Sequence, residues 1–185
     1  MDILKRVAGY AVAFITAIVV YFGIQLFIAG DKLATFTEFR SDEGRFTVLM
    51  PGKPKAQNQV LDTPVGKVDM VMFTAGSNKA GCVVAYADYP AQLINTTDPQ
   101  KTLDGARDGA VKNVNGRLVS ETSIYFHGLP ARDVRIEIPG KAFVTGRFIL
   151  ASPRFYELLF IAPTDTGREQ DISKFFNSFT IDGVK

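Results

Sequence analysis

The sequence opens with a long apolar stretch, residues 7–30, in which no residue carries a formal charge. An α-helix rises about 1.5 Å per residue, so this stretch would extend roughly 36 Å and cross a hydrocarbon core of about 30 Å. The residues that follow mix polar and apolar positions, as a globular domain does. The pattern therefore predicts a transmembrane helix over 7–30, a linker over 31–36 and a single soluble domain over 37–185.

The flanks of this stretch bear on its orientation and on whether it is retained. Lys5 and Arg6 precede it, so the positive-inside rule keeps residues 1–6 in the cytoplasm and exports the domain. The alternative is a cleaved signal peptide, which has a shorter apolar region and small residues at its cleavage site. A cut after Gly30 would place Ile28 where a small residue is preferred. We therefore favour a retained, single-pass anchor and an extracytoplasmic domain, periplasmic in a bacterium.

Within the domain, runs of alternating or apolar residues separated by turn residues predict an antiparallel sheet. The expected strands cover residues 39–50 (two short pieces around a turn), 57–61, 65–74, 81–89, 117–126, 133–138, 142–150, 155–161 and 179–181. Most of the connections are too short for crossovers, which makes consecutive strands antiparallel neighbours.

Two segments have helical rather than strand periodicity. Residues 97–99 (TDP) supply an N-cap and a proline at the first helical position, and an apolar face then recurs up to residue 114. Residues 166–169 (TGRE) fit a capping box before a second, short helix. Because the strands between 142 and 161 are apolar on both sides, both faces of the sheet should be covered. The predicted fold class is α+β, an antiparallel sheet sandwiched by helices (α/β/α).

Composition narrows the classes of function. The formal net charge is only +2, with both signs interspersed, so the chain lacks the basic surface typical of nucleic-acid-binding proteins. The one cysteine, Cys82, lies in an apolar strand-like run and is expected to be a small buried residue rather than a reactive thiol. We expect no nucleic-acid partner.

Two short motifs resemble those of a known family. Residues 39–51 read FRSDEGRFTVLMP and resemble the opening of PsbP-like domains, and residues 175–179 (FFNSF) are similar to the closing helix-to-strand turn of that group. The resemblance spans roughly residues 37–183. It implies an antiparallel sheet between helices. Members of the group include extrinsic photosystem II subunits and a Ran-GTPase-binding protein, which act by binding rather than catalysis. No site residue is carried over from the family.

Candidate chemistry is sparse along the chain. His127, the only histidine, lies at a predicted strand end and is expected at an exposed turn. No nucleotide, metal or cofactor motif is present, so we assign no catalytic, metal or cofactor-binding residue and expect no cofactor. If the Ser152-Pro153 turn is symmetric, Arg147 lies opposite Glu157 on an apolar face, as a structural ion pair or as part of a ligand site.

The four arginines that concentrate on the later strands allow two interpretations. They are Arg132, Arg135, Arg147 and Arg154. They could form a pocket for an anion, or they could line the solvated edge of a sheet. Because their positions alternate, we do not expect all four on one face.

The leading functional hypothesis is a membrane-anchored, non-catalytic binding or assembly module with a protein partner. The anchor, the near-neutral domain and the missing active-site motifs all favour it. The alternative is a small-ligand-binding domain or a hydrolase-type enzyme with a pocket near His127, Arg147 and Glu157. The position of a concave pocket relative to these three residues would discriminate between the two classes.

Overall fold

The computed structural model describes residues 35–63, 66–77, 80–90, 97–163 and 167–184. The expected transmembrane helix over residues 7–30, and the tail before it, lie outside these residues. Within the part of the chain that the structure describes, no helix is both long and apolar enough to cross a bilayer. The anchor and the domain's side of the membrane therefore stay predictions.

The described residues form ten strands and two helices. In chain order these are β1 (Phe36–Ser41), β2 (Phe46–Pro51), β3 (Lys55–Thr63), β4 (Gly66–Ser77), β5 (Ala80–Asp88), α3 (Pro99–Asn113), β6 (Arg117–Phe126), β7 (Leu129–Ile138), β8 (Ala142–Ala151), β9 (Arg154–Ala162), α4 (Glu169–Ser178) and β10 (Thr180–Ile181). Each strand and helix that was expected within the domain is present. The main difference in bounds is β7, which starts at Leu129 rather than at residue 133.

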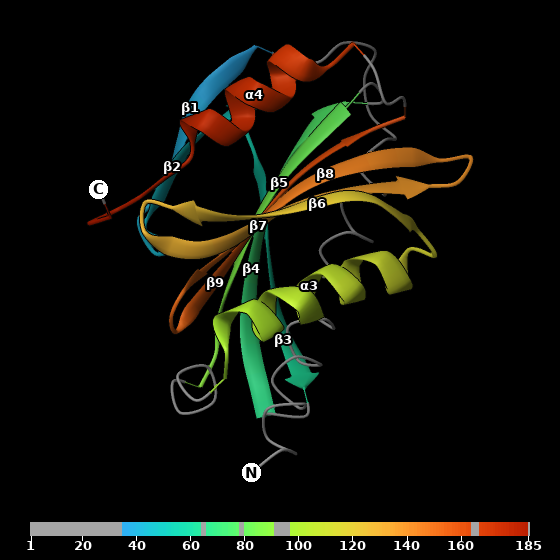
Figure 1. Ribbon diagram of the computed structural model, residues 1–185. Coiled ribbons are helices and arrows are strands. Elements are labelled where there is room, and N and C mark those ends of the chain that lie inside the picture. The colour runs from blue at the N-terminus through green and yellow to red at the C-terminus, as the bar shows by residue number, and fades with distance from the viewer. Residues whose placement is uncertain (1–34, 64–65, 78–79, 91–96, 164–166, 185) are drawn as a thin grey trace.

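The strands form two antiparallel sheets rather than the one that was expected. The large sheet has the order β3-β4-β5-β9-β8-β7-β6, and the small one has the order β1-β2-β10. The first hairpin separates from the large sheet because β2 pairs on one side with β1 and on the other with β10, from the C-terminal end of the chain. Figure 1 shows β1 and β2 beside α4, on one side of the large sheet.

The large sheet is covered on both faces, as its apolar strands predict. Helix α3 packs on one face, against β7 and β8. The other face is covered by α4 together with the small sheet, and α4 contacts β2 and β9 (Figure 1). The expected sandwich is therefore correct in its layers, but one outer layer combines a helix with three strands.

The two helices begin differently. The carboxylate of Asp98 caps α3 by accepting a hydrogen bond from the Gln100 amide at 2.9 Å, with Pro99 at the first helical position, as expected. Helix α4 instead begins at Glu169, and its N-cap residue, Arg168, makes no capping hydrogen bond from its side chain within the described chain. The expected capping box over residues 166–169, with Thr166 as the N-cap, is therefore wrong, and Thr166 itself lies outside the described residues.

Phe46 on β2 joins the small sheet to the large one. Its side chain is fully buried, and its ring lies at the centre of an aromatic cluster. Ring centroids between 5.5 and 6.5 Å away belong to Phe39, Phe73, Tyr86, Tyr156 and Phe179. These neighbours come from both sheets and from the segment after α4, so this one side chain connects three parts of the fold.

Replacing Phe46 with alanine is expected to lower the free energy of unfolding by roughly 3–5 kcal/mol, because a large cavity opens between the sheets. Urea unfolding followed by circular dichroism measures this. The matched control is Val119→Ala on β6, where the side chain is 45% exposed and the change should stay within about 0.5 kcal/mol. Equal losses in the two variants would contradict the central role of Phe46.

Cys82 is fully buried in β5, as the sequence predicted, and burial raises the pKa of its thiol well above the ordinary value. The thiolate is the reactive form, so the folded protein is expected to resist alkylation at neutral pH. Labelling with a thiol reagent should become rapid only in denaturant. Fast, complete labelling of the native protein would show that β5 is not where the structure places it.

Candidate functional site

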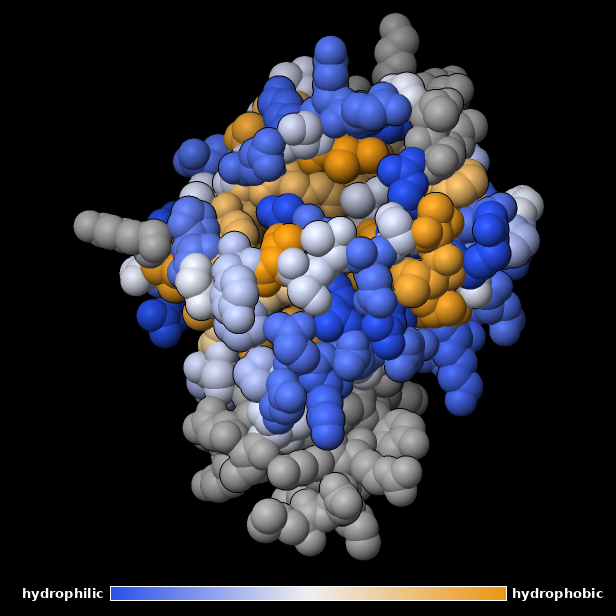
Figure 2. Space-filling view, in the orientation of Figure 1, coloured by the Kyte–Doolittle hydropathy of each residue, from blue (hydrophilic) through white to orange (hydrophobic). Residues whose placement is uncertain are grey.

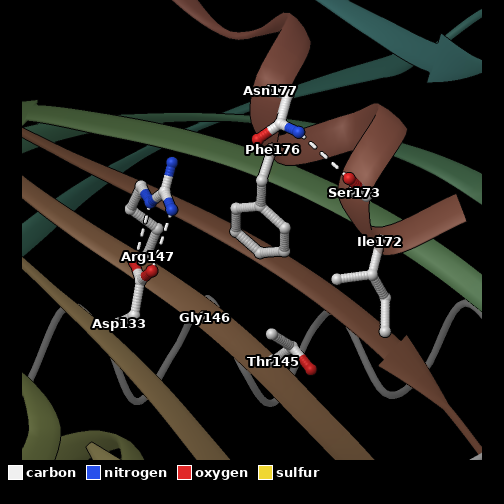
Figure 3. Close-up of a pocket in the computed structure, with 8 residues that line it drawn as sticks. All are labelled: Asp133, Thr145, Gly146, Arg147, Ile172, Ser173, Phe176 and Asn177. Carbon is white, nitrogen blue, oxygen red and sulfur yellow. Dashed lines mark hydrogen bonds and ion pairs between the residues drawn. The ribbon is translucent and has the colours of Figure 1, made fainter. Parts of the chain in front are cut away.

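A groove of the described domain lies between α4 and the large sheet. Its volume is about 190 Å³, and the residues that line it are Asp133, Thr145, Gly146, Arg147, Ile172, Ser173, Phe176 and Asn177 (Figure 3). Figure 2 shows a hollow with hydrophobic walls in this region, between α4 and the outer strands. The groove therefore has an apolar helix wall and a more polar sheet floor.

The polar floor of the groove is formed by side chains of β7 and β8 that point to the same face of the large sheet. Asp133 on β7 and Arg147 on β8 are directly opposite each other in the register, so their side chains leave the sheet on the same face. Thr145, two positions from Arg147 on β8, shares this face. Helix α4 supplies the wall, with Ile172 and Phe176 four positions apart and so on one side of the helix.

Arg147 is held in a fixed orientation. Its Nε donates to Asp133 Oδ1 at 2.7 Å and its Nη2 donates to Oδ2 at 2.8 Å, a bidentate pair. The guanidinium carbon also lies 5.4 Å from the centre of the Phe176 ring, within reach of a cation–π interaction. Figure 3 shows the remaining nitrogen, Nη1, on the side of the guanidinium away from Asp133. The groove thus presents one positioned cationic donor beside an aromatic ring.

The expected ion pair between Arg147 and Glu157 is wrong. The two-residue turn at Ser152-Pro153 pairs β8 and β9 so that Arg147 is opposite Leu158, and Glu157 is opposite Phe148. A shift of one residue moves a side chain to the other face of a sheet, so Arg147 and Glu157 point to opposite faces. The symmetry of the turn was correct, but the residue assigned opposite Arg147 was one position off.

Glu157 lies instead on the α3 side of the large sheet, where it is 1% exposed. Its neighbours along this face of β9, Phe155 and Leu159, belong to the core under α3. Tyr89 belongs to the same core, and its pKa is raised well above the ordinary value, mainly by burial and further by the charge of Glu157. Glu157 is therefore a buried carboxyl group of the core rather than part of the groove.

His127 lies in the turn between β6 and β7, as its sequence position predicted. Its backbone has φ 48°, its side chain is exposed, and its ring stands edge-on to Phe126. It does not line the groove that holds Arg147. The pocket proposed for an enzyme or small-ligand site near His127, Arg147 and Glu157 is therefore not formed, because the three side chains occupy three separate places.

A charged cluster under α3 was not foreseen. Arg132 on β7 is only 5% exposed; it contacts Asp104 of α3 in an ion pair and donates to Gln100 Oε1 at 2.9 Å. Arg107 joins this cluster through Glu121 on β6, at 2.7 Å, and hydrogen bonds to Asp108 and Glu121 raise its pKa. Strand alternation could have predicted the burial of Arg132, because Arg132 and Val134 are two positions apart on β7 and share the face that packs against α3.

A wider hollow of about 780 Å³ lies at the turn end of the sheet, around Ser152-Pro153 and the C-terminal segment. Arg154, one of the two arginines that line it, is fully engaged. Its Nε and Nη2 donate to Asp88, its Nη1 donates to the Glu43 carbonyl, all at 2.6 Å, and its guanidinium lies 4.4 Å from the centre of the Tyr86 ring. The arginines at 132, 147 and 154 thus serve three different places, and the groove at Arg147 is the better candidate.

Comparison with solved structures shows the fold. The solution structure of cyanobacterial PsbP (CyanoP) from Synechocystis sp. PCC 6803 matches with a TM-score of 0.55 and 11% identity, covering 83% of this chain and 96% of that one. A protein of unknown function from Pseudomonas aeruginosa also matches, at a TM-score of 0.38 and 13% identity over 76% of this chain and 89% of that one, too low to carry an argument.

No protein-family model matches the sequence, and no curated protein matches it. At 11% identity the likeness to cyanobacterial PsbP concerns the fold alone. The PsbP-like fold that the motifs over residues 39–51 and 175–179 implied is therefore confirmed.

The ion pairs of Arg132 and Arg147 are expected to differ in their contribution to the free energy of unfolding. Arg132→Ala should cost about 2–3 kcal/mol, because a nearly buried side chain loses its packing and its charge-assisted hydrogen bonds, while Asp104 and Glu121 stay paired with Arg107. Arg147→Ala should cost roughly 1 kcal/mol, since Asp133 is 37% exposed and regains water. Urea unfolding of both variants measures the difference. A larger loss in Arg147→Ala than in Arg132→Ala would contradict this assignment of burial.

Proposed function

We propose that this protein is a membrane-tethered, non-catalytic binding module that holds a protein partner in the groove between α4 and β8. The tether is the apolar stretch over residues 7–30, with the domain on the extracytoplasmic side. The PsbP-like fold is compatible with this role, because a fold does not by itself dictate chemistry and function resides in the site.

The oriented guanidinium of Arg147 is the observation that carries the proposal. Asp133 and Phe176 fix its position, and Nη1 remains on the side away from Asp133 (Figure 3). A donor positioned in advance binds a carboxylate without the entropic cost of ordering a long side chain. Next to it, Ile172 and Phe176 offer an apolar surface. The complementary partner presents a carboxylate, from an acidic side chain or a chain terminus, beside an apolar side chain.

The size of the groove favours a protein partner over an enclosed small molecule. Pockets for drug-sized ligands typically measure about 300–1,000 Å³, and most of the ligand's surface is buried in them. The groove here measures about 190 Å³ and is open on one side. It has room to anchor one or two side chains of a larger partner, whose remaining surface would rest on the surrounding strands and helix.

The polar groups of the groove are arranged for binding rather than for nucleophilic catalysis. The hydroxyl of Ser173 accepts a hydrogen bond from Asn177 Nδ2 at 3.0 Å. Its hydrogen-bond partner among the described groove residues is therefore an amide and not a base. Both oxygens of Asp133 accept hydrogen bonds from Arg147, so this carboxylate is engaged by a cation rather than by a hydroxyl group. Activating a nucleophile needs a base within hydrogen-bond distance, and no described pair in the groove meets this condition.

Photo-crosslinking from the rim of the groove tests the proposal. A photoreactive amino acid at Asn177, which is exposed on α4, should give a discrete adduct in cells that make the full-length protein. Arg147→Lys in the same chain should abolish most of this adduct: lysine keeps a positive charge against Asp133 but lacks the second donor that would reach the partner.

The matched control places the photoreactive group at Lys112, exposed on α3 at the other face of the sheet. An adduct of the same size from Lys112, or an adduct from Asn177 that survives Arg147→Lys at full strength, would refute the groove as the binding site. Unfolding curves of the Arg147→Lys protein show whether the lost adduct reflects binding rather than stability.

A further inference from the structure

One edge of the large sheet differs from the other sheet edges. β3 is the outermost strand on one side, and the described residues place no further strand beyond it. At the opposite edge, β6 carries a bulge between Leu118 and Ser120 and charged side chains held in ion pairs, such as Glu121. Bulges and charges are devices that keep an edge strand from pairing with another chain.

The edges of the small sheet are also protected. β10 is only two residues long. β1 has six residues and carries the charges of Glu38 and Arg40, and Arg40 is paired with Asp182. Short edge strands and charged edge strands both disfavour pairing with another chain.

The middle of β3 has none of these protective features, because its two charged residues, Lys55 and Asp62, lie near the ends of the strand. The strand pairs with β4 without interruption over nine residues, from Lys55 to Thr63. It contains no proline, and no residue from 56 to 61 carries a charge. Val60 is 61% exposed, the highest exposure of a large aliphatic side chain in the described domain. The outer row of backbone N–H and C=O groups of such a strand is a template for another strand.

We infer that β3 pairs with β3 of a second copy of this chain, in an antiparallel arrangement centred on Asn58. In this register Ala56 lies opposite Val60 of the second copy, and Gln57 lies opposite Gln59. The pairing joins two large sheets into one continuous sheet with a two-fold axis through Asn58. It covers the exposed Val60 with an apolar partner and satisfies the outer backbone groups of both strands.

The sequence of β3 selects this register. A two-fold axis perpendicular to the sheet keeps each face on its own side, so only residues of the same face come opposite each other. The uncharged segment covers residues 56–61, and an axis through Asn58 pairs residues 56–60 wholly with one another and sets Val60 opposite the apolar Ala56. The flanking charges are then kept apart from like charges: Lys55 lies opposite Leu61, and Asp62 lies opposite Pro54.

Charge substitutions on the axis test the inference. Asn58 is exposed, and in the dimer its side chain meets its own copy, so Asn58→Lys and Asn58→Glu each place two like charges opposite one another. The full-length protein in detergent is expected to sediment as a dimer, and each variant alone as a monomer. An equimolar mixture of the two variants should recover the dimer, because opposite charges then face each other.

The controls are Thr122→Lys and Thr122→Glu, at an exposed position on the opposite edge strand β6, which should leave the dimer unchanged. A monomeric wild-type protein would overturn the inference, including the case in which β3 takes an extended segment of a different protein. A dimer that persists in both Asn58 variants, through another surface, would also overturn it.

Disulfide crosslinking through a cysteine at position 58 gives a second test, which detects the dimer directly instead of its disruption. Asn58→Cys should form a disulfide-linked dimer under mild oxidation, since residues directly opposite on paired strands come within disulfide distance. Native Cys82 is fully buried and should not compete. Thr122→Cys is the control. Equal crosslinking at positions 58 and 122, or none at 58, counts against pairing along β3.

Discussion

Burial of both faces of the large sheet is the constraint on which the rest of the structure depends. β9 lies near the middle of this sheet, and its side chains from Phe155 to Ala162 are all buried. They alternate between two cores, one under α3 and one under α4 with the small sheet. Neither face of such a strand tolerates water, so two separate layers must be supplied. One is a helix, and the other is assembled from both ends of the domain.

The groove follows from the unequal width of these layers. Helix α4 and the small sheet contact β4, β5 and β9. The next strands in the order of the large sheet, β8 and β7, lie at the border of this cover. On the uncovered side, β7 and β8 present polar residues, and at the border Arg147 lies between Asp133 and the ring of Phe176. The guanidinium of Arg147 therefore lies beside the apolar side chains of α4 because the layer of α4 and the small sheet ends at this strand. The two edges of the same sheet also differ, since Glu121 of β6 pairs with Arg107 of α3, whereas Asp62 of β3 pairs with Lys67 on the neighbouring β4.

Sequence reasoning succeeded where local patterns carry the information. The periodicities located the strands and both helices, Asp98 was correctly predicted as a cap, and Cys82 as a buried residue. It failed where the answer depends on a one-residue register or on segments distant in the chain. The pair between Arg147 and Glu157 was wrong because one position reverses the face of a strand. The small sheet was missed because β2 pairs with a strand more than 130 residues later.

The sequence by itself determined the apolar stretch before the domain, the strands and helices, and the need to cover a doubly apolar sheet, because hydrophobic periodicity and turn residues are local. Only the tertiary structure decided which charges meet. Arg147 binds Asp133 across a strand pair, and Arg132 binds Asp104 across a helix–sheet interface. Coulomb forces and hydrogen bonds act over a few ångströms, and the register and the packing of layers bring residues within that distance.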